Sequence, residues 1–281
     1  MFSLSQVNDE NLLQTICFFD DLIKLIFPDS GAQVGRKRTI SLSEAAAICL
    51  IKANYGVVQL KQLHRLLTDR FSDEFKLPCY KNFVTTMNIS TPALLVLIQI
   101  VLSTRNKNAG IIKLTDLTPI PVCKNIRISS HKVMKRLATR YKTTTGYFYG
   151  LKLHVVTDEH GNLLKLMFTT GNVDDRKALD KFLDILQDSL IIADAGYISK
   201  MLSQKARKRM NLLLTCSRNT MKKLITPFHL FLLNKRINVE HLFSLLKDRF
   251  GLIISLPRSE LGYLAHYIRV LFAYLFMPNI S

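Results

Sequence analysis

The chain has 281 residues, of which 48% are hydrophobic and 21% are charged, and its formal net charge is +18. This length allows one large domain or two smaller ones, and the composition excludes a disordered or fibrous chain. The basic excess lies mainly after residue 110, since residues 111–281 hold 27 Lys and Arg against 12 Asp and Glu. Such an excess is typical of proteins that bind nucleic acid.

The cysteines and the apolar segments indicate where the protein acts. The five cysteines include no Cys-x-x-Cys pair, which favours free thiols in a reducing cytoplasm over disulfides or a structural zinc site. The N-terminus shows no signal-peptide pattern. The longest apolar run, residues 92–102, is too short to span a bilayer. We therefore expect a cytoplasmic protein without a membrane partner.

Residues 1–105 are predicted to be helical. The expected helices cover residues 11–27, 41–53, 58–70, 80–87 and 92–103. Ser41 and Glu44 match a capping box at the start of the second helix. The short Gly-containing turn at residues 54–56 fits either a helix-turn-helix or a plain helical hairpin. We predict a helical DNA-binding region, in which the helix-turn-helix would be the sequence-reading element.

After a polar linker at residues 105–110, the pattern changes to alternating strands and helices. The expected strands are residues 111–115, 146–158, 163–169, 190–193 and 211–216, and the expected helices are 173–187, 199–210, 236–247 and 262–276. Alternation of this kind predicts an α/β fold, in which sites form at the carboxyl ends of strands. Asp116 and Asp194 each follow such a strand.

A third acid, Glu240, lies in the expected helix at residues 236–247, and Arg236 and Lys247 fall on its face of that helix. Three carboxylates that converge could hold two Mg²⁺ or Mn²⁺ ions for phosphoryl chemistry. Taken singly, each aspartate could be a helix cap, and the helix face could be an ordinary solvated face with an ion pair. The prediction of a metal site depends on all three acids meeting in space.

Other polar residues receive separate predictions. Residues 124–142 hold seven Lys and Arg and no acid, so the segment either lies along a phosphate backbone or is a solvated loop. Its candidate DNA-binding residues are Arg127, Lys132, Lys135, Arg136 and Arg140. Lys205 and residues 207–209 fit phosphate contact or a solvated helix end. His154 is expected in the core, and Asp174 and Asp175 are expected to cap the following helix.

Several motifs resemble those of the DDE transposases of bacterial insertion sequences, nearest to the nine-eighty-two family. The motifs are Leu114-Thr115-Asp116 with residues 119–123, Thr143-Thr144-Thr145-Gly146 with residues 147–150, Ile192-Ala193-Asp194-Ala195-Gly196-Tyr197, and Arg236-x3-Glu240-x6-Lys247. The resemblance implies a ribonuclease H-like catalytic domain with a mixed sheet over residues 111–281, after the all-helical domain. It also implies that Asp116, Asp194 and Glu240 form a metal-binding triad, while Arg236 and Lys247 contact the terminal DNA. One departure is Leu233, where related groups often have a tyrosine.

The activity that the resemblance implies is transposition. We expect metal-dependent cleavage at the ends of an insertion sequence and strand transfer into target DNA by a 3′-hydroxyl. The expected partners are the double-stranded DNA of the element ends and of the target, with a homodimer on DNA in the nucleoid of the bacterial cytoplasm. Two alternatives remain open, a hydrolytic nuclease or resolvase of the same fold and a catalytically dead DNA-binding regulator.

Overall fold

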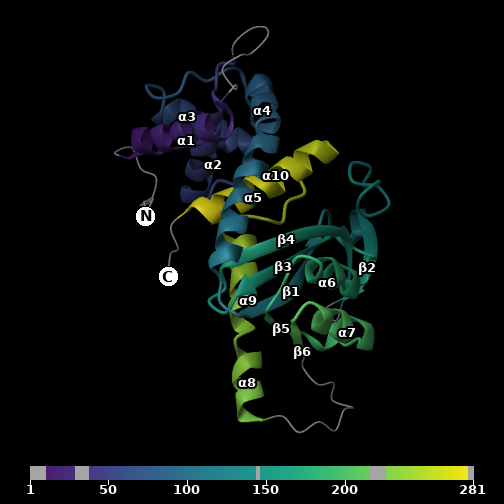
Figure 1. Ribbon diagram of the computed structural model, residues 1–281. Helices are drawn as coiled ribbons and strands as arrows, with labels where there is room; N and C mark the ends of the chain where they lie inside the picture. Colours follow the sequence, from purple (N-terminus) through teal and green to yellow (C-terminus); the bar gives the residue numbers. More distant parts are fainter. Residues whose placement is uncertain (1–10, 29–37, 144–145, 216–225, 278–281) are drawn as a thin grey trace. The chain divides into compact units, whose positions relative to one another are not determined.

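The computed structural model describes residues 11–28, 38–143, 146–215 and 226–277 (Figure 1). The chain forms two compact units. The helical unit contains Met1–Gln99, Leu246–Leu252 and Leu256–Ser281, and the α/β unit contains Ile100–Leu245 and Ile253–Ser255. These units differ from the predicted division at residues 105–111, because the last helix groups with the N-terminal helices. The roles assigned to residues 1–105 and 111–281 stay predictions.

The helical unit contains helices at the positions that the sequence indicated. They are α1 (Leu12–Ile26), α2 (Leu42–Asn54), α3 (Leu60–Arg70), α4 (Tyr80–Ile89), the first part of α5 (Thr91–Asn108) and α10 (Glu260–Phe276). The capping box is confirmed, since the Ser41 Oγ accepts the Glu44 N–H at 3.1 Å and a Glu44 carboxylate oxygen accepts the Ser41 N–H at 2.6 Å. These two bonds satisfy N–H groups that the first turn of a helix leaves without partners.

The core of the helical unit is built on α2 and α10. Residues 45–51 of α2 are all buried, and α10 buries Tyr263, Tyr267 and Phe272. The Phe272 ring lies 5.5 Å from the ring of Phe19 on α1. The predicted helix at 262–276 is therefore confirmed, and its apolar face completes the core of a unit that begins more than 200 residues earlier in the chain.

Helices α4 and α5 follow one another almost without interruption. Together they give 29 residues of helix, Tyr80–Asn108, which are long and apolar enough to cross a membrane. The apolar run at residues 92–102 lies within this longer helix. A single helix of this kind is weak evidence for a membrane span, because the core helix of a soluble protein has the same length and composition.

Over its described residues, the α/β unit contains one mixed sheet of six strands. The strands are β1 (Ile112–Pro121), β2 (Thr139–Thr143), β3 (Gly146–Asp158), β4 (Leu163–Thr170), β5 (Leu190–Ala193) and β6 (Leu212–Thr215). Their order is β2-β3-β1-β5-β6. Strand β2 pairs with one half of β3, and β4 pairs with the other half. Strands β1, β3 and β4 are antiparallel neighbours, whereas β5 and β6 run parallel to β1. The predicted α/β fold with a mixed sheet is confirmed.

Strand β1 is longer than the sequence indicated. It continues through Pro119 to Pro121, whereas the predicted strand ended at residue 115. Proline removes a backbone donor and is tolerated on a strand edge that has no neighbour. Strand β5 pairs only with Ile112–Leu114, so the side of β1 away from β3 is free of ladder bonds at both prolines. Asp116 therefore lies within β1, and not at its carboxyl end as predicted.

Helices cover the sheet of the α/β unit. Helices α6 (Asp175–Leu183) and α7 (Lys200–Lys208) bury Phe182, Leu202 and other apolar residues against Val156 and Ile191 of the sheet. Helix α9 (Ile237–Ser244) contacts β1. Both α6 and α7 are shorter than predicted. Strand β2 and helix α8 (Pro227–Asn234) were not predicted, and Cys216, Thr144 and Thr145 lie outside the described residues.

Candidate active site

Asp116 lies in β1, and Asp194 directly follows the adjacent parallel strand β5 at the same level. Leu114 of β1 pairs with Ile192 of β5, so the two aspartates each follow the last paired residue by two positions. Because side chains alternate between the faces of a sheet, residues two positions beyond a pair project from the same face. The topology therefore brings together two acids that are 78 residues apart in the sequence.

The guanidinium group of Arg236 joins these two carboxylates. Its Nη2 donates to the Asp116 Oδ2 at 2.8 Å, and its Nη1 donates to the Asp194 Oδ1 at 3.2 Å. The side chains of Arg236 and Asp116 are 17% and 16% exposed, whereas that of Asp194 is 53% exposed. The contact of Arg236 with Asp116 is thus shielded from water, whereas its contact with Asp194 is open to water.

The start of α9 is held in place by the turn between β3 and β4. The Lys235 Nζ donates to the Glu159 Oε2 at 2.7 Å, and the Asn238 side-chain amide donates to the Glu159 backbone carbonyl at 2.7 Å. Gly161 in this turn has a φ of +84°, and a Cβ atom there would lie 3.2 Å from the Asn238 carbonyl oxygen. These contacts flank Arg236 in the sequence and fix it beside β1.

The third predicted acid, Glu240, lies on α9 one turn after Arg236, and its side chain is exposed. Among the described residues, no three His, Cys, Asp or Glu side chains lie close enough to hold a metal ion. The structure thus joins Asp116 and Asp194 through Arg236 and places Glu240 on the helix that carries this arginine. The membership of Glu240 in the site stays a prediction.

The helix around Glu240 is less regular than predicted. Arg236 directly precedes the first turn of α9. The helix ends at Ser244, and Leu245–Arg249 then forms a π-helical turn. The assumption of one α-helix with a constant 100° per residue was therefore wrong, because a π-turn rotates the following residues to a different face. Lys247 lies in this turn, partly buried, and its pKa is lowered by burial.

Asp116 lies in an electrostatic environment that differs from that of a free carboxyl group. Burial raises the pKa of Asp116, and the Arg236 charge together with hydrogen bonds from Arg236 and the Leu117 N–H offsets only part of this effect. The Leu117 N–H donates to the Asp116 Oδ1 at 2.8 Å. Arg236 thus stabilises the charged form of a largely buried carboxyl group. Since both acids offer oxygen ligands to one shared cation, their chemistry fits a hard divalent ion such as Mg²⁺.

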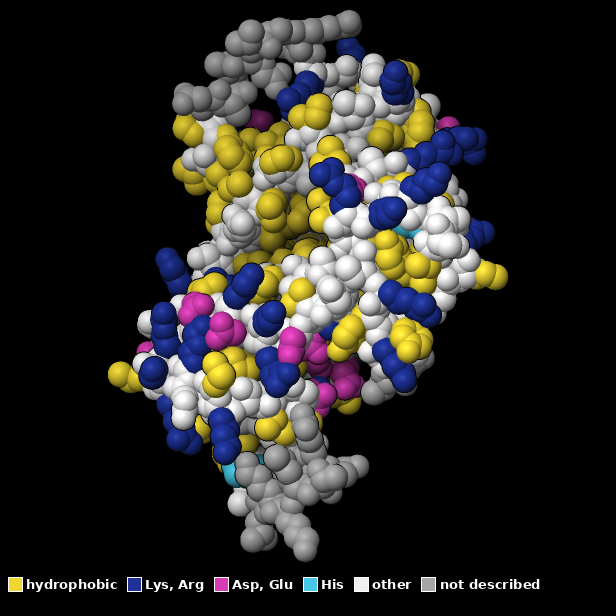
Figure 2. Space-filling model, turned by 90° about the vertical axis from the view of Figure 1, so that its right-hand side faces the viewer, with side chains coloured by type: hydrophobic (Ala, Val, Ile, Leu, Met, Phe, Trp, Pro, Cys, Tyr) yellow, Lys and Arg dark blue, Asp and Glu magenta, His cyan; other side chains and the backbone are white. Residues whose placement is uncertain are grey.

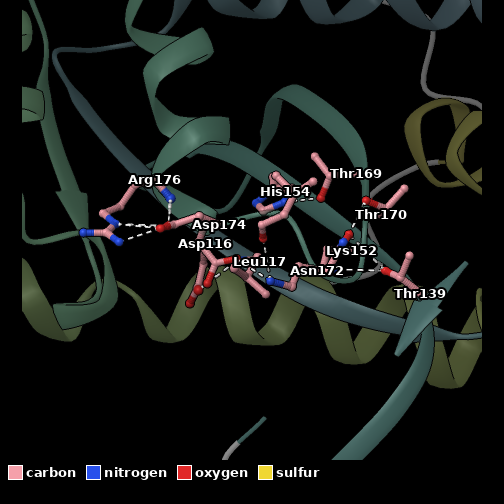
Figure 3. A network of polar contacts seen from close by, with 12 residues as sticks. Asp116, Leu117, Thr139, Lys152, His154, Thr169, Thr170, Asn172, Asp174 and Arg176 are labelled. Atoms are coloured by element: carbon pink, nitrogen blue, oxygen red, sulfur yellow. Dashed lines mark hydrogen bonds and ion pairs between the residues drawn. The ribbon is translucent and has the colours of Figure 1, made fainter. Parts of the chain in front are cut away.

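A second polar network lies on the neighbouring strands (Figure 3). Lys152 of β3 has a buried side chain, and its Nζ donates to the Asp175 Oδ1 at 2.8 Å and lies 3.8 Å from the centre of the Tyr141 ring. The His154 Nε2 and the Thr169 Oγ1 are 2.9 Å apart, and burial lowers the pKa of His154 to about 4. The predicted core position of His154 is confirmed.

The network also separates the roles of two neighbouring acids. Asp174 caps α6 as predicted, since its side chain accepts the Arg176 N–H at 2.9 Å (Figure 3). Asp175 instead pairs with Lys152, a contact that the sequence analysis missed. The available signal was Lys152 itself, a single lysine between Leu151 and Leu153 in a buried strand, because a buried cation needs an anionic partner.

The basic segment at residues 124–142 is mostly exposed. Val122, Met134 and Ala138 anchor it in the core, and the side-chain amide of Asn125 donates to the Tyr147 carbonyl at 2.7 Å. The predicted DNA-binding residues all have exposed side chains: Arg127, Lys132, Lys135, Arg136 and Arg140. Figure 2 shows Lys and Arg side chains over much of the visible face, with acidic side chains at several places among them.

Lys205 has a structural role instead. Its Nζ lies 2.8 Å from carboxylate oxygens of both Asp180 and Asp184, which ties α7 to α6. Lys205 therefore fits neither the predicted phosphate contact nor a solvated helix end, because acids of the same protein neutralise its charge.

The chain is similar to known transposases. The family model described as "Transposase DDE domain" matches residues 105–256, more than half of the chain. A structure of the piggyBac transposase synaptic complex with hairpin DNA matches with a TM-score of 0.50 and 10% identity, over 97% of this chain and 73% of that one. At this identity the likeness shows the fold alone, which agrees with the ribonuclease H-like prediction.

Two further matches are weaker. A pre-cleavage Mos1 transpososome matches with a TM-score of 0.26 and 12% identity, over 96% of this chain and 97% of that one. The Mos1 strand transfer complex matches with a TM-score of 0.27 and 12% identity, over 98% of each chain. No curated protein matches the sequence. The family match over residues 105–256 shows that this chain belongs to the DDE transposases.

Proposed function

We propose that this transposase cleaves DNA at the ends of an insertion sequence and joins the freed 3′-hydroxyl to target DNA, in a reaction that depends on divalent metal ions. The observation that carries the proposal is the meeting of Asp116 and Asp194 at one shared cation, the Arg236 guanidinium. A site that holds a guanidinium between two carboxylates has the charge and the oxygen ligands that a divalent ion requires.

In this proposal the acids have one common task. Asp116 and Asp194 would supply carboxylate ligands from the sheet, and Glu240 would supply a third from α9. The ligand set suits two Mg²⁺ or Mn²⁺ ions, which when bound would neutralise charge at the phosphate and activate the attacking hydroxyl. The protein itself has to hold the DNA in line with these acids and exclude competing orientations.

The basic residues would supply the DNA contacts. Arg127, Arg136 and the other exposed cations of residues 124–142 would lie along the phosphate backbone, where each contact adds affinity without reading sequence. Arg236 and Lys247 would contact the terminal DNA, and Arg236 would have to leave the two aspartates to do so. The helical region at residues 1–105 would recognise the element ends.

The proposed partners are double-stranded DNA of the element ends and of the target, bound by a homodimer. Two ends must be held together before they can be joined to one target, and two copies of one chain achieve this with two equal sites. The piggyBac match is a synaptic complex with hairpin DNA, which supports DNA as a partner. The protein would act on the nucleoid in the bacterial cytoplasm.

The experiment is a cleavage and joining assay with oligonucleotides that carry the element ends, with Mg²⁺ present. We expect Glu240→Gln to lose both products and to keep DNA binding, because the change removes a ligand charge from an exposed position. Asp188→Asn is the control, since this exposed acid has a φ of +48° that asparagine tolerates. Hydrolysis without joined product would favour a nuclease, and no cutting by the unmodified protein would remove the enzymatic assignment.

A further inference from the structure

A groove in the α/β unit lies between α7 and β6, which are side by side in Figure 1. Its volume is about 410 Å³, and it is lined by residues 198–200, by one face of α7 and by Leu212–Thr215 of β6. None of these residues takes part in the Arg236 bridge or in the Lys152 network. The groove is therefore a separate feature of this unit.

Helix α7 divides its side chains between the core and this groove. Leu202 and Ala206 pack into the core beneath the helix. The groove takes the opposite face, because positions i, i+3, i+4 and i+7 lie together on a helix. The side chains of this face are Lys200, Ser203, Gln204 and Arg207. One wall of the groove is thus a row of polar side chains that begins and ends with a cation.

The groove is positively charged. Lys200 and Arg207 are both exposed, and no acid lines the groove over the described residues. Neither cation forms an ion pair with a described residue, whereas Lys205 on another face of α7 is paired with two acids at α6. The two cations are about 10 Å apart along the helix axis. This spacing suits an extended polyanion, such as a DNA backbone, better than a single small anion.

The groove reaches the candidate active site at one end. Ser199 lines the groove and follows Asp194 closely in the sequence. Thr215 of β6 pairs with Ala193 of β5, the residue before Asp194, and paired strands are about 4.8 Å apart. A DNA strand in the groove would therefore pass beside Asp194.

We propose that the groove between α7 and β6 holds the sugar–phosphate backbone of the target DNA. The inference rests on the proposed function, in which Arg236 and α9 contact the terminal DNA next to β1. Since β5 lies between β1 and β6, the groove is on the other side of Asp194 from those contacts. Joining requires a second DNA to reach the acids, and side chains that contact phosphates accept any sequence. Lys200 and Arg207 would each neutralise one phosphate.

The test measures binding of a duplex without element ends to the full-length protein over a series of salt concentrations. Replacing both Lys200 and Arg207 with glutamine should reduce the slope of log K against log salt by about 1.8, because two phosphate contacts are lost. The matched control is Lys177→Gln with Lys208→Gln, which removes two exposed cations of α6 and α7 outside the groove and should leave the slope nearly unchanged. Lys200→Arg with Arg207→Lys keeps both charges and should keep the slope. An unchanged slope for the glutamine variant would overturn the assignment and favour an acidic peptide that pairs with the edge of β6.

A joining assay with element ends separates this inference from the proposed function. If the unmodified protein joins ends and the glutamine variant needs more target DNA for half-maximal joining, the groove is supported as a target site. Slower cleavage of the ends by the variant, with an unchanged requirement for target DNA, would place terminal DNA in the groove and overturn the inference. If the unmodified protein joins no ends, the proposed function fails, while the salt slope still decides whether the groove binds DNA.

Discussion

Replacing Arg236 with glutamine removes the cation that Asp116 and Asp194 share. Glutamine keeps the length and part of the polarity of the side chain but leaves the buried Asp116 without a counter-charge. Burial already raises the pKa of Asp116 in the presence of Arg236, so the uncompensated carboxylate should be markedly less stable. We predict that Arg236→Gln destabilises the protein in EDTA and that Mg²⁺ restores most of the loss.

The size of the effect follows from the exposure of the partners. Removing one member of a fully buried ion pair costs about 3–5 kcal/mol, and a fully exposed pair contributes about 0–1 kcal/mol. The pair of Arg236 and Asp116 lies between these limits, with side chains 17% and 16% exposed, and Asp194 is more than half exposed and adds little. We therefore expect a loss of about 2 kcal/mol, which lowers the Tm by about 5 °C in a chain of this size.

Thermal unfolding of the full-length protein, in EDTA and in millimolar Mg²⁺, measures both parts of the prediction. The matched control is Lys235→Gln, because the ion pair of Lys235 with Glu159 has comparable exposure, 22% and 30%, and lies one residue away. This control should lose a similar or smaller amount of stability, but Mg²⁺ should not restore it. Only the variant at residue 236 vacates the position between the two aspartates.

Two results would refute the reasoning about Arg236. If Mg²⁺ raises the Tm of Arg236→Gln no more than it raises that of Lys235→Gln, the space between the aspartates is not a cation site. If Arg236→Gln is as stable as the unmodified protein in EDTA, the bridge contributes nothing and Asp116 does not depend on it.

Three further predictions concern other parts of the chain. Burial holds the pKa of His154 near 4, below its ordinary 6.5, so the stability that the neutral side chain contributes is present above pH 6.5 and is lost as the pH falls towards 4. In chemical unfolding at a series of pH values, His154→Gln should remove about 3 kcal/mol of this pH dependence. An unchanged pH profile would contradict the assignment. Gly150→Ala should lower the Tm by more than 5 °C or abolish folding, measured by circular dichroism, because the added Cβ would lie 2.0 Å from a backbone oxygen of β1. Replacing both Arg127 and Arg136 with glutamine should reduce the slope of log K against log salt by about 1.8 in a DNA-binding titration, whereas Lys205→Gln, whose charge is already paired, should leave it nearly unchanged.

The regular elements could be predicted where the local pattern is strong. The capping box at Ser41, the strand before Asp194 and the β3–β4 hairpin follow from side-chain periodicity and turn residues, which act over a few positions. Strand β1 was predicted too short, because proline is rare within strands and the chain has Pro119 and Pro121 here. The strand tolerates Pro119 because β5 ends before it. The end of a neighbouring strand cannot be read from the residues around Pro119 in the sequence.

The candidate site shows the same division. That two distant aspartates would meet was predicted from strands and a family pattern, and the register of β1 and β5 accounts for it. The position of Arg236 between them was not predicted, because a helical repeat relates residues on one helix and says nothing about the strand beneath. The irregular turn after Ser244 was missed for the same reason: π-turns have no simple sequence signal.

The central claim is that the acids of this site bind divalent metal, and a crystal structure of the protein with Mn²⁺ tests it most directly through the anomalous signal of the ion. We predict a peak between the carboxylates of Asp116 and Asp194, at about 2.1 Å from their oxygens, with the Arg236 guanidinium displaced and Glu240 turned towards the ion. A fully occupied Mn²⁺ site elsewhere on the protein, with Arg236 still bridging the two aspartates, would contradict the account.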